Sequence, residues 1–295
     1  MCSTPGRPTL DSDLVSIGDA LKADLSSFSP QERRVARVLL ADYPRAALGT
    51  SAELAAAAGV SPPTVVRFAR SLGHSGFPAL QQALLDELSE RVASPLSLYE
   101  DTRANRAEGH WLDRGVQVAT ASITQSLTAI PTAELDAAVT LLADPRMRIR
   151  AVGGRFSGHL AGYLARHLRQ IRRNVSAPDD GRTIDAADVM DADRRDVFVV
   201  YDFRRYQTTT VERATELADA GAHIVCITDE WLSPVAQAAE VVLPTSVRST
   251  GAFDSAAAAF VLTELLVDAV LDRLGPAAVE RMGRWEAATA HEVLA

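Results

Sequence analysis

The sequence predicts an α + α/β protein with an all-helical domain over residues 14–92, a linker over 93–115, and a three-layer αβα domain with a parallel sheet over 116–280. The first half reads as short helices separated by brief turns, without an alternating strand pattern. After Arg148, apolar runs alternate with helical stretches; these runs are RIRAVG, DVFVVY, AHIVCIT and EVVLP. That alternation is typical of a parallel sheet covered by helices. A chain of 295 residues, 47% of them hydrophobic, is long enough for two such cores.

Two short helices are predicted within residues 50–85. Ser51 is expected to cap the first, which ends at Gly59, a residue suited to a left-handed C-terminal position. Ser61 is the expected N-cap of the second, with Pro62 at its first position and Gly73 at its end. The apolar face of the second helix comprises Val65, Phe68, Ala69 and Leu72. Two helices joined by a tight glycine-containing turn form a helix-turn-helix unit, whose second helix enters the major groove of DNA.

The charge distribution supports a DNA-binding role for this segment. No acidic residue lies between Glu53 and Asp86, although the whole chain has a net charge of -8. Thr64 and Arg67 are three residues apart and share one helix face, where a hydroxyl and a guanidinium can reach a phosphate or a base edge. The candidate DNA-binding residues are Ser61, Thr64, Arg67, Arg70 and His74. The alternative is an ordinary helix pair with solvated surface charges.

Composition argues against several other classes of protein. The cysteines, Cys2 and Cys226, are far apart and the histidines are scattered singly, so we expect no disulfide framework, no metal and no cofactor. No apolar run reaches about 18 residues, and the N-terminus lacks the pattern of a signal peptide. We therefore expect a cytoplasmic protein without a membrane partner.

The segments SPQERRVARVLLADY and SAELAAAAGVSPPTVVRFARSLGHSGFPALQQAL resemble the N-terminal domain of the RpiR/MurR family of bacterial transcriptional regulators. The resemblance rests on Ala55, Gly59, Val60, Ser61, Thr64, Val65, Arg67, Phe68, Leu72, Gly73, Gly76 and Phe77. With the second half, it extends from about residue 28 to residue 274. It implies a helix-turn-helix domain followed by a sugar-isomerase (SIS) domain that binds phosphorylated sugars.

The SIS resemblance implies a first ligand loop after the strand RIRAVG. In the family this loop reads Gly-any-Gly-any-Ser, and its serine helps to hold the sugar phosphate. Gly153 and Ser157 match this pattern, whereas Arg155 stands where the second glycine is usual. Such a turn presents backbone amides to an anion. The alternative is that Gly154 relieves a tight turn and Ser157 is an ordinary helix cap.

The second ligand loop of the SIS family usually reads Ser-any-Ser-Gly-any-Thr. Here the stretch YDFRRYQTTT places Asp202, Arg204, Arg205 and Gln207 at these positions. Two interpretations remain open. An arginine pairs with a phosphate or carboxylate of a ligand, or Asp202 forms an internal ion pair with one arginine and closes the site.

A third loop, SVRSTGAFDS, is expected to close over the ligand, as in the family. Ser249, Thr250 and Ser255 are candidate contacts there, and Asp254 is equally suited to capping the following helix. The full set of candidate effector-binding residues is Gly153, Arg155, Ser157, Asp202, Arg204, Arg205, Gln207, Ser249 and Thr250.

The sequence therefore predicts a transcriptional regulator that binds operator DNA under the control of a small anionic effector, of the sugar-phosphate type, in the SIS domain. We expect a homodimer or tetramer, because one small domain reads a half-site weakly. Catalysis is not expected, since the third loop has no glutamate, and His159 and His167 look like ordinary helix residues. The alternatives are an SIS-type isomerase with a helical arm, and an SIS domain that has lost its ligand and only mediates oligomerisation.

Overall fold

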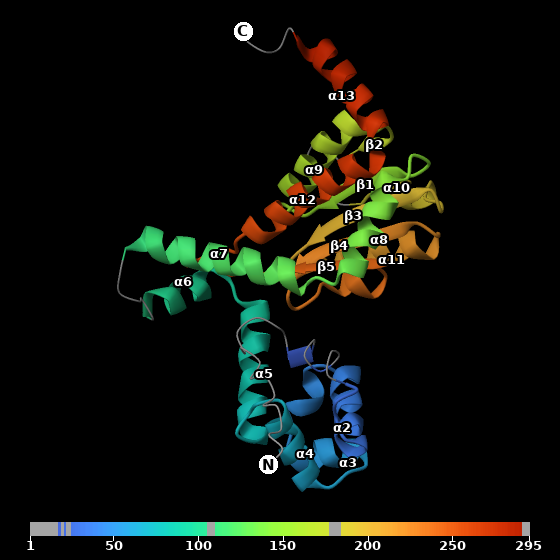
Figure 1. The fold of residues 1–295 in the computed structure, drawn as a ribbon. Coiled ribbons are helices and arrows are strands. Elements are labelled where there is room, and N and C mark those ends of the chain that lie inside the picture. Colours follow the sequence, from blue (N-terminus) through green and yellow to red (C-terminus); the bar gives the residue numbers. More distant parts are fainter. Residues whose placement is uncertain (1–16, 19–20, 22–24, 105–109, 177–183, 291–295) are drawn as a thin grey trace, which may run out of the picture. The chain divides into compact units, whose positions relative to one another are not determined.

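The computed structural model describes residues 17–18, 21, 25–104, 110–176 and 184–290. The chain divides into two compact units, residues 1–93 and 94–295 (Figure 1). The first unit is helical and the second contains a parallel sheet, which confirms the predicted fold class.

The first unit is built from four α-helices and a short 3-10 helix among its described residues. These are α2 (Pro30–Ala41), η1 (Arg45–Ala47), α3 (Ser51–Ala58), α4 (Pro62–Ser71) and α5 (Phe77–Val92). The predicted N-cap of α3 is wrong by one residue. Thr50, not Ser51, is the cap, because its hydroxyl accepts from the amide of Glu53 while the Glu53 carboxylate accepts from the amide of Thr50.

Helix α4 has the predicted boundaries. Ser61 is its N-cap with extended backbone, Pro62 occupies the first position, and Gly73 follows the helix with φ of 89°. Its buried face packs into the core of the unit, where Phe68 meets Phe28 with ring centroids 5.4 Å apart. The opposite face is therefore free to carry polar residues.

The second unit contains a five-stranded parallel sheet of order β2-β1-β3-β4-β5. The strands are β1 (Arg148–Gly153), β2 (Val175–Ser176), β3 (Asp196–Asp202), β4 (His223–Asp229) and β5 (Val241–Thr245). The helices are α6 (Pro95–Ala104), α7 (Trp111–Ala129), α8 (Thr132–Ala143), α9 (Gly158–Ile171), α10 (Ala186–Met190), α11 (Thr208–Asp219), η2 (Pro234–Gln237), α12 (Ala257–Leu274) and α13 (Pro276–Thr289). The short edge strand β2 escaped prediction because two residues carry no periodicity.

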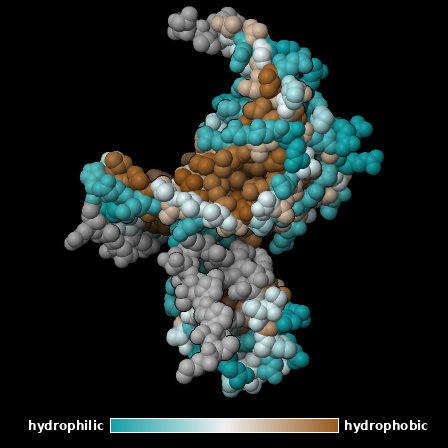
Figure 2. Space-filling view, viewed as in Figure 1, coloured by the Kyte–Doolittle hydropathy of each residue, from teal (hydrophilic) through white to brown (hydrophobic). Residues whose placement is uncertain are grey.

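Alternating side chains of the strands form two cores, one on each face of the sheet. Val197, Val199 and Tyr201 of β3 pack with α8, α9 and α12, whereas Phe198 and Val200 pack with α11 and η2. This alternation confirms the three-layer αβα architecture. Figure 2 shows apolar surface gathered over the part of this unit that holds α12.

The segment predicted as a linker, residues 93–115, contains helix α6 and the start of α7. Ser94 and Ser97 bond reciprocally at the start of α6, as in a helix cap. Leu96 and Tyr99 of this helix are exposed, so its apolar residues do not form the single buried face that would have indicated a helix.

Candidate functional sites

The candidate DNA-binding residues on α4 differ in their accessibility. Ser61, Arg67 and Arg70 are exposed, His74 is half-buried, and Thr64 is only 1% exposed. Burial lowers the pKa of His74, so its imidazole is neutral at pH 7. The positive charge of this face therefore comes from the two arginines.

Thr64 lies at the centre of a small polar network beneath the exposed face. Its hydroxyl lies 3.0 Å from the Ser61 hydroxyl and 3.3 Å from Gln31 Oε1 on α2. It also accepts from the Arg67 guanidinium at 3.1 Å. Because Thr64 is buried, the structure favours a role in orienting Arg67 over direct contact with DNA.

The N-terminus of α4 offers few amide donors to a phosphate. Pro62 and Pro63 have no N–H, and the amide of Thr64 bonds to the carbonyl of Ser61. Two neighbouring residues of α2 were missed from the sequence alone. Gln31 touches Thr64 directly, and the exposed Arg34 lies one turn further along the same helix side.

The candidate effector site lies at the carboxyl ends of β1, β3, β4 and β5, which share one edge because the sheet is parallel. Ser157 connects two of these ends: its hydroxyl donates to the carbonyl of Tyr201 at 2.7 Å and accepts from the amide of Gly154 at 2.8 Å. Gln207 lies against the same loop, since a Cβ on Gly154 would be 3.5 Å from its Nε2. The structure thus brings Gly153, Ser157 and Gln207 together.

Arg204 forms a buried ion pair with Asp254. Its Nε lies 2.9 Å from both carboxylate oxygens, and one terminal nitrogen makes a further close contact. The guanidinium also stacks on the Trp231 ring at 5.2 Å from the ring centroid. Arg204 is 9% exposed, so the pair is shielded from solvent on the arginine side.

This pairing corrects two sequence-based interpretations. The arginine partner is Asp254, and Asp202 instead accepts a 2.5 Å hydrogen bond from the Ser233 hydroxyl. Asp254 is not the cap of α12: the N-cap residue is Ala256, and the Ser255 hydroxyl accepts from the amide of Ala257 at 3.2 Å. The sequence did not predict this pairing because Arg204 and Asp254 are 50 residues apart, and local sequence does not reveal such a contact.

The remaining predicted residues are exposed at the rim. Arg205 has a left-handed backbone, with φ of 64°, and its side chain is exposed. Arg155 is exposed beside Phe156, with its guanidinium 5.1 Å from the ring centroid. Thr250 is also exposed, and Ser249 donates to the carbonyl of Phe253 at 2.5 Å, which orders its own loop.

The electrostatics of this edge also depends on the carboxylate of Asp202, a predicted site residue, and on those of Asp229 and Glu230, which were not predicted as site residues. Asp229 is fully buried and accepts from the Tyr206 hydroxyl at 2.6 Å and from the amide of Trp231 at 3.1 Å. Burial raises the pKa of Glu230 to about 7. Burial likewise raises the pKa of Asp202 to about 6, aided by the charge of Asp229 and opposed by the hydrogen bond from Ser233.

We expect Asp202→Asn to stabilise the second unit more at pH 7.5 than at pH 4.5. The raised pKa means that Asp202 binds a proton more tightly in the folded state than in the unfolded state. The stability that this proton contributes is therefore present below about pH 4 and is lost as pH rises to about 6. Asparagine does not titrate, so the variant does not lose this stability. Its free energy of unfolding relative to that of wild type should therefore rise by about 2 kcal/mol from pH 4.5 to pH 7.5. Urea unfolding at both pH values measures the difference.

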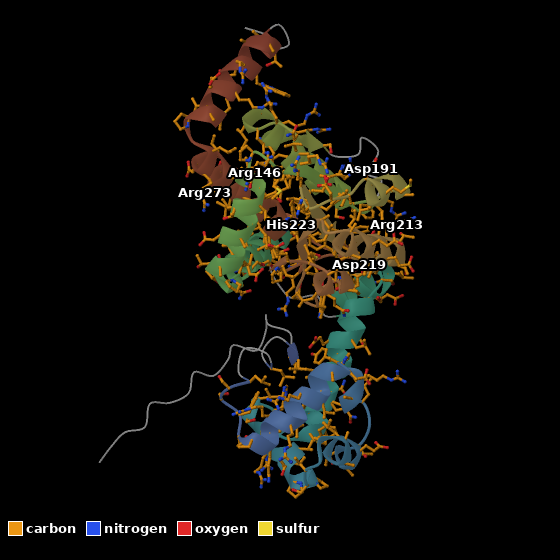
Figure 3. All side chains as sticks on the ribbon, turned by 90° about the vertical axis from the view of Figure 1, so that its right-hand side faces the viewer. Arg146, Asp191, Arg213, Asp219, His223 and Arg273 are labelled. Carbon is orange, nitrogen blue, oxygen red and sulfur yellow. The ribbon has the colours of Figure 1, made fainter. Side chains whose placement is uncertain are left out.

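The exposed Asp219, labelled in Figure 3, gives a matched control for the Asp202 substitution. Asp219→Asn removes the same charge from the exposed end of α11 and serves as the reference for the effect of the charge change alone. If the free energy of unfolding depends on pH equally in the two variants, the folded state does not hold a proton on Asp202.

A cavity of about 560 Å³ lies at the opposite edge of the sheet. Arg146, Asp191 and His223, which precede or open β1, β3 and β4, lie on that side in Figure 3. Its arginines are paired: Arg148 with Asp196 at 2.6 Å, and Arg150 with Asp188. Although this cavity is large, the arginines that line it are already paired with carboxylates and are not available to an anionic ligand. The described residues contain neither a cluster of metal-ligating side chains nor a helix that could cross a membrane.

Comparisons with known proteins match both units. The helix-turn-helix domain of the rpiR family matches residues 16–91, and the SIS domain matches residues 141–269. The HTH-type transcriptional regulator YfhH of Escherichia coli is 27% identical over 261 residues, covering 87% of this chain and 92% of YfhH. The HTH-type transcriptional regulator HexR of Pseudomonas aeruginosa is 35% identical over 134 residues, which is 45% of this chain and 41% of HexR.

Among solved structures, Vibrio vulnificus NanR complexed with ManNAc-6P has a TM-score of 0.55 at 20% identity. The similarity covers 94% of this chain and 99% of the NanR chain. At this level of identity, the likeness establishes a shared fold.

Proposed function

Because the chain belongs to the RpiR family of helix-turn-helix transcriptional regulators with an SIS domain, we propose that α4 binds operator DNA and that an anion at the β-strand tips controls this binding. DNA binding by α4 is supported by one observation: Arg67 and Arg70 are exposed on a helix whose other face is buried. Ser61 is exposed at the start of the same helix and supplies a further hydroxyl. Guanidinium groups on a recognition helix bind guanine edges and phosphates.

The proposed effector is a sugar phosphate or a related phosphate ester. NanR, which shares the fold, was solved with ManNAc-6P bound, and that complex supports the class of ligand. In this chain Arg204 supplies the buried cation, while Gly154 and Ser157 line the neighbouring loop. Arg155, Arg205, Gln207, Ser249 and Thr250 are proposed to contribute at the rim.

We propose that the SIS domain binds its ligand without turnover and that the protein works in the cytoplasm. The carboxylate of Glu230, whose pKa burial raises to about 7, is half-buried and already accepts a 3.3 Å hydrogen bond from the amide of Val247. YfhH, which matches 87% of this chain, is named as a transcriptional regulator, and this agrees with a binding role.

We also propose a homodimer or tetramer on a palindromic operator, because two linked helix-turn-helix domains read two half-sites. The exposed Phe260 and Leu265 of α12 are candidate subunit contacts.

Fluorescence anisotropy on DNA from upstream of the protein's own coding region tests this proposal. We expect saturable binding that resists a scrambled competitor at fixed salt, and a change in affinity of at least fivefold on adding one member of a panel of sugar phosphates. Failure of every upstream fragment to compete specifically would contradict the operator proposal. Specific binding that no phosphate ester alters would instead contradict the effector proposal.

A further inference from the structure

The ion pair between Arg204 and Asp254 joins two of the loops that surround the candidate effector site. Arg204 lies between β3 and α11, and Asp254 lies between β5 and α12. Both oxygens of the carboxylate lie 2.9 Å from Nε of the guanidinium, and one also contacts a terminal nitrogen. This is the fork geometry by which arginine binds the carboxylate or phosphate of a ligand.

The two partners differ in their access to solvent. The Arg204 side chain is 6% exposed, whereas that of Asp254 is 23% exposed. An anion arriving from solvent therefore meets the carboxylate before the guanidinium, and it reaches Arg204 only if Asp254 withdraws.

The loop that carries Asp254 can release it without breaking the core of the unit. Its base is closed by a 2.9 Å hydrogen bond from the amide of Ser255 to the carbonyl of Val247. Between these residues, Ser249 bonds to Gly251 and Phe253, which belong to the same loop. The exposed tip thus holds its shape through its own contacts.

Electrostatics favours replacement of Asp254 by a stronger anion rather than simple loss of the pair. A buried guanidinium that loses its carboxylate partner is destabilised by several kcal/mol, so exchange of Asp254 for another anion is favoured over its simple withdrawal. A ligand that carries one carboxylate would replace the carboxylate of Asp254 by a group of the same charge and geometry. A phosphate ester has up to two negative charges and three terminal oxygens, so it offers the guanidinium more charge and more acceptor atoms than a monocarboxylate does.

We propose that Asp254 is a built-in competitor that occupies, in the free protein, the place of the effector's phosphate on Arg204. This inference rests on the proposed effector function and names its specificity element: the site selects phosphate esters over monocarboxylates because only the former displace Asp254. Displacement frees the loop that leads into α12, so that occupancy of the site changes the start of that helix.

Removing the competitor should strengthen phosphate binding. The apparent affinity of a ligand falls in proportion to the fraction of protein in the competent state, so Asp254→Asn should tighten the binding of inorganic phosphate by about tenfold or more. Trp231, whose ring stacks on Arg204, gives a local fluorescence signal once Trp111 and Trp285 are replaced by phenylalanine. Titration of the full chain at constant ionic strength with phosphate, and separately with acetate, measures both affinities.

Matched variants separate competition from a general charge effect. Asp268→Asn removes one exposed carboxylate from α12 and should leave phosphate affinity unchanged. Asp254→Glu retains a competing carboxylate and should bind phosphate more weakly than Asp254→Asn. Asp254→Ala gives a second competitor-free chain if the asparagine variant folds poorly, as judged by circular dichroism.

Unchanged phosphate affinity in both competitor-free variants would overturn the proposal, as would an equal gain in Asp268→Asn or equal tightening of acetate. The operator titration with sugar phosphates is independent of this result. A wild-type chain whose DNA binding responds to a sugar phosphate, combined with no effect of removing Asp254, would retain the proposed function and reject only the competitor.

Discussion

Replacing Arg67 with alanine is expected to weaken specific operator binding by about 5- to 150-fold, because one good base contact is worth roughly 1–3 kcal/mol. The side chain is exposed on α4 and is oriented by its hydrogen bond to the buried Thr64. Anisotropy titrations of wild type and variant against the same operator measure the loss. Repeating them over a range of salt concentrations distinguishes the two kinds of contact, since a lost phosphate contact lowers the salt dependence by about one counterion.

Two further variants distinguish the loss of a DNA contact by Arg67 from the general effect of removing a positive charge. Arg166→Ala removes an exposed arginine from α9 in the other unit and should leave operator affinity unchanged. Thr64→Val preserves the buried shape but removes the hydroxyl that Arg67 and Gln31 contact, so it should cause a smaller loss than Arg67→Ala. A change within twofold on replacing Arg67 would remove this residue from the DNA interface.

The helix-turn-helix unit was predictable because its boundaries are fixed by local chemistry. Gly59 and Gly73 both adopt positive φ, and Pro62 occupies the first position of a helix, as the sequence indicates. Exposure was harder to predict. Thr64 shares a helix face with Arg67, but its burial follows from packing beside α2, which depends on residues more than 30 positions away.

The candidate effector site was predictable only where it follows the strand–loop–helix pattern. Gly153 and Ser157 were located by their resemblance to the first SIS loop, and the loop after β3 by its place at a strand end. For Asp254 a helix cap was considered equally suitable, because local sequence gives no sign of its partner Arg204, which is 50 residues away. Asp229 was missed because a carboxylate at the end of an apolar strand gives no signal of the three donors that surround it.

Gly153→Ala is expected to destabilise the second unit by about 3 kcal/mol and to abolish its response to phosphate esters. A Cβ at this position would lie 2.7 Å from both the amide nitrogen of Gly158 and the carbonyl carbon of Ser157. These are backbone atoms of the first turn of α9, so no side-chain rotation can relieve the clash. The end of β1 and the start of α9 would have to separate.

Such a separation would also disrupt the polar contacts of the loop. The Ser157 hydroxyl joins the amide of Gly154 to the carbonyl of Tyr201, and both distances depend on close approach of β1, β3 and α9. Chemical unfolding followed by Trp231 fluorescence measures the loss of stability in this unit. Phosphate titration of the folded variant measures the loss of response, and operator binding in the absence of effector should persist.

Gly162→Ala provides the matched control within α9. No atom lies within 4 Å of a Cβ built on Gly162, and an alanine in a helix interior is favoured over glycine by up to about 1 kcal/mol. The same substitution should therefore destabilise the unit at residue 153 and stabilise it nine residues later. If both variants are as stable as wild type, the close approach at Gly153 does not constrain the loop, and the requirement for glycine at this strand end has another cause.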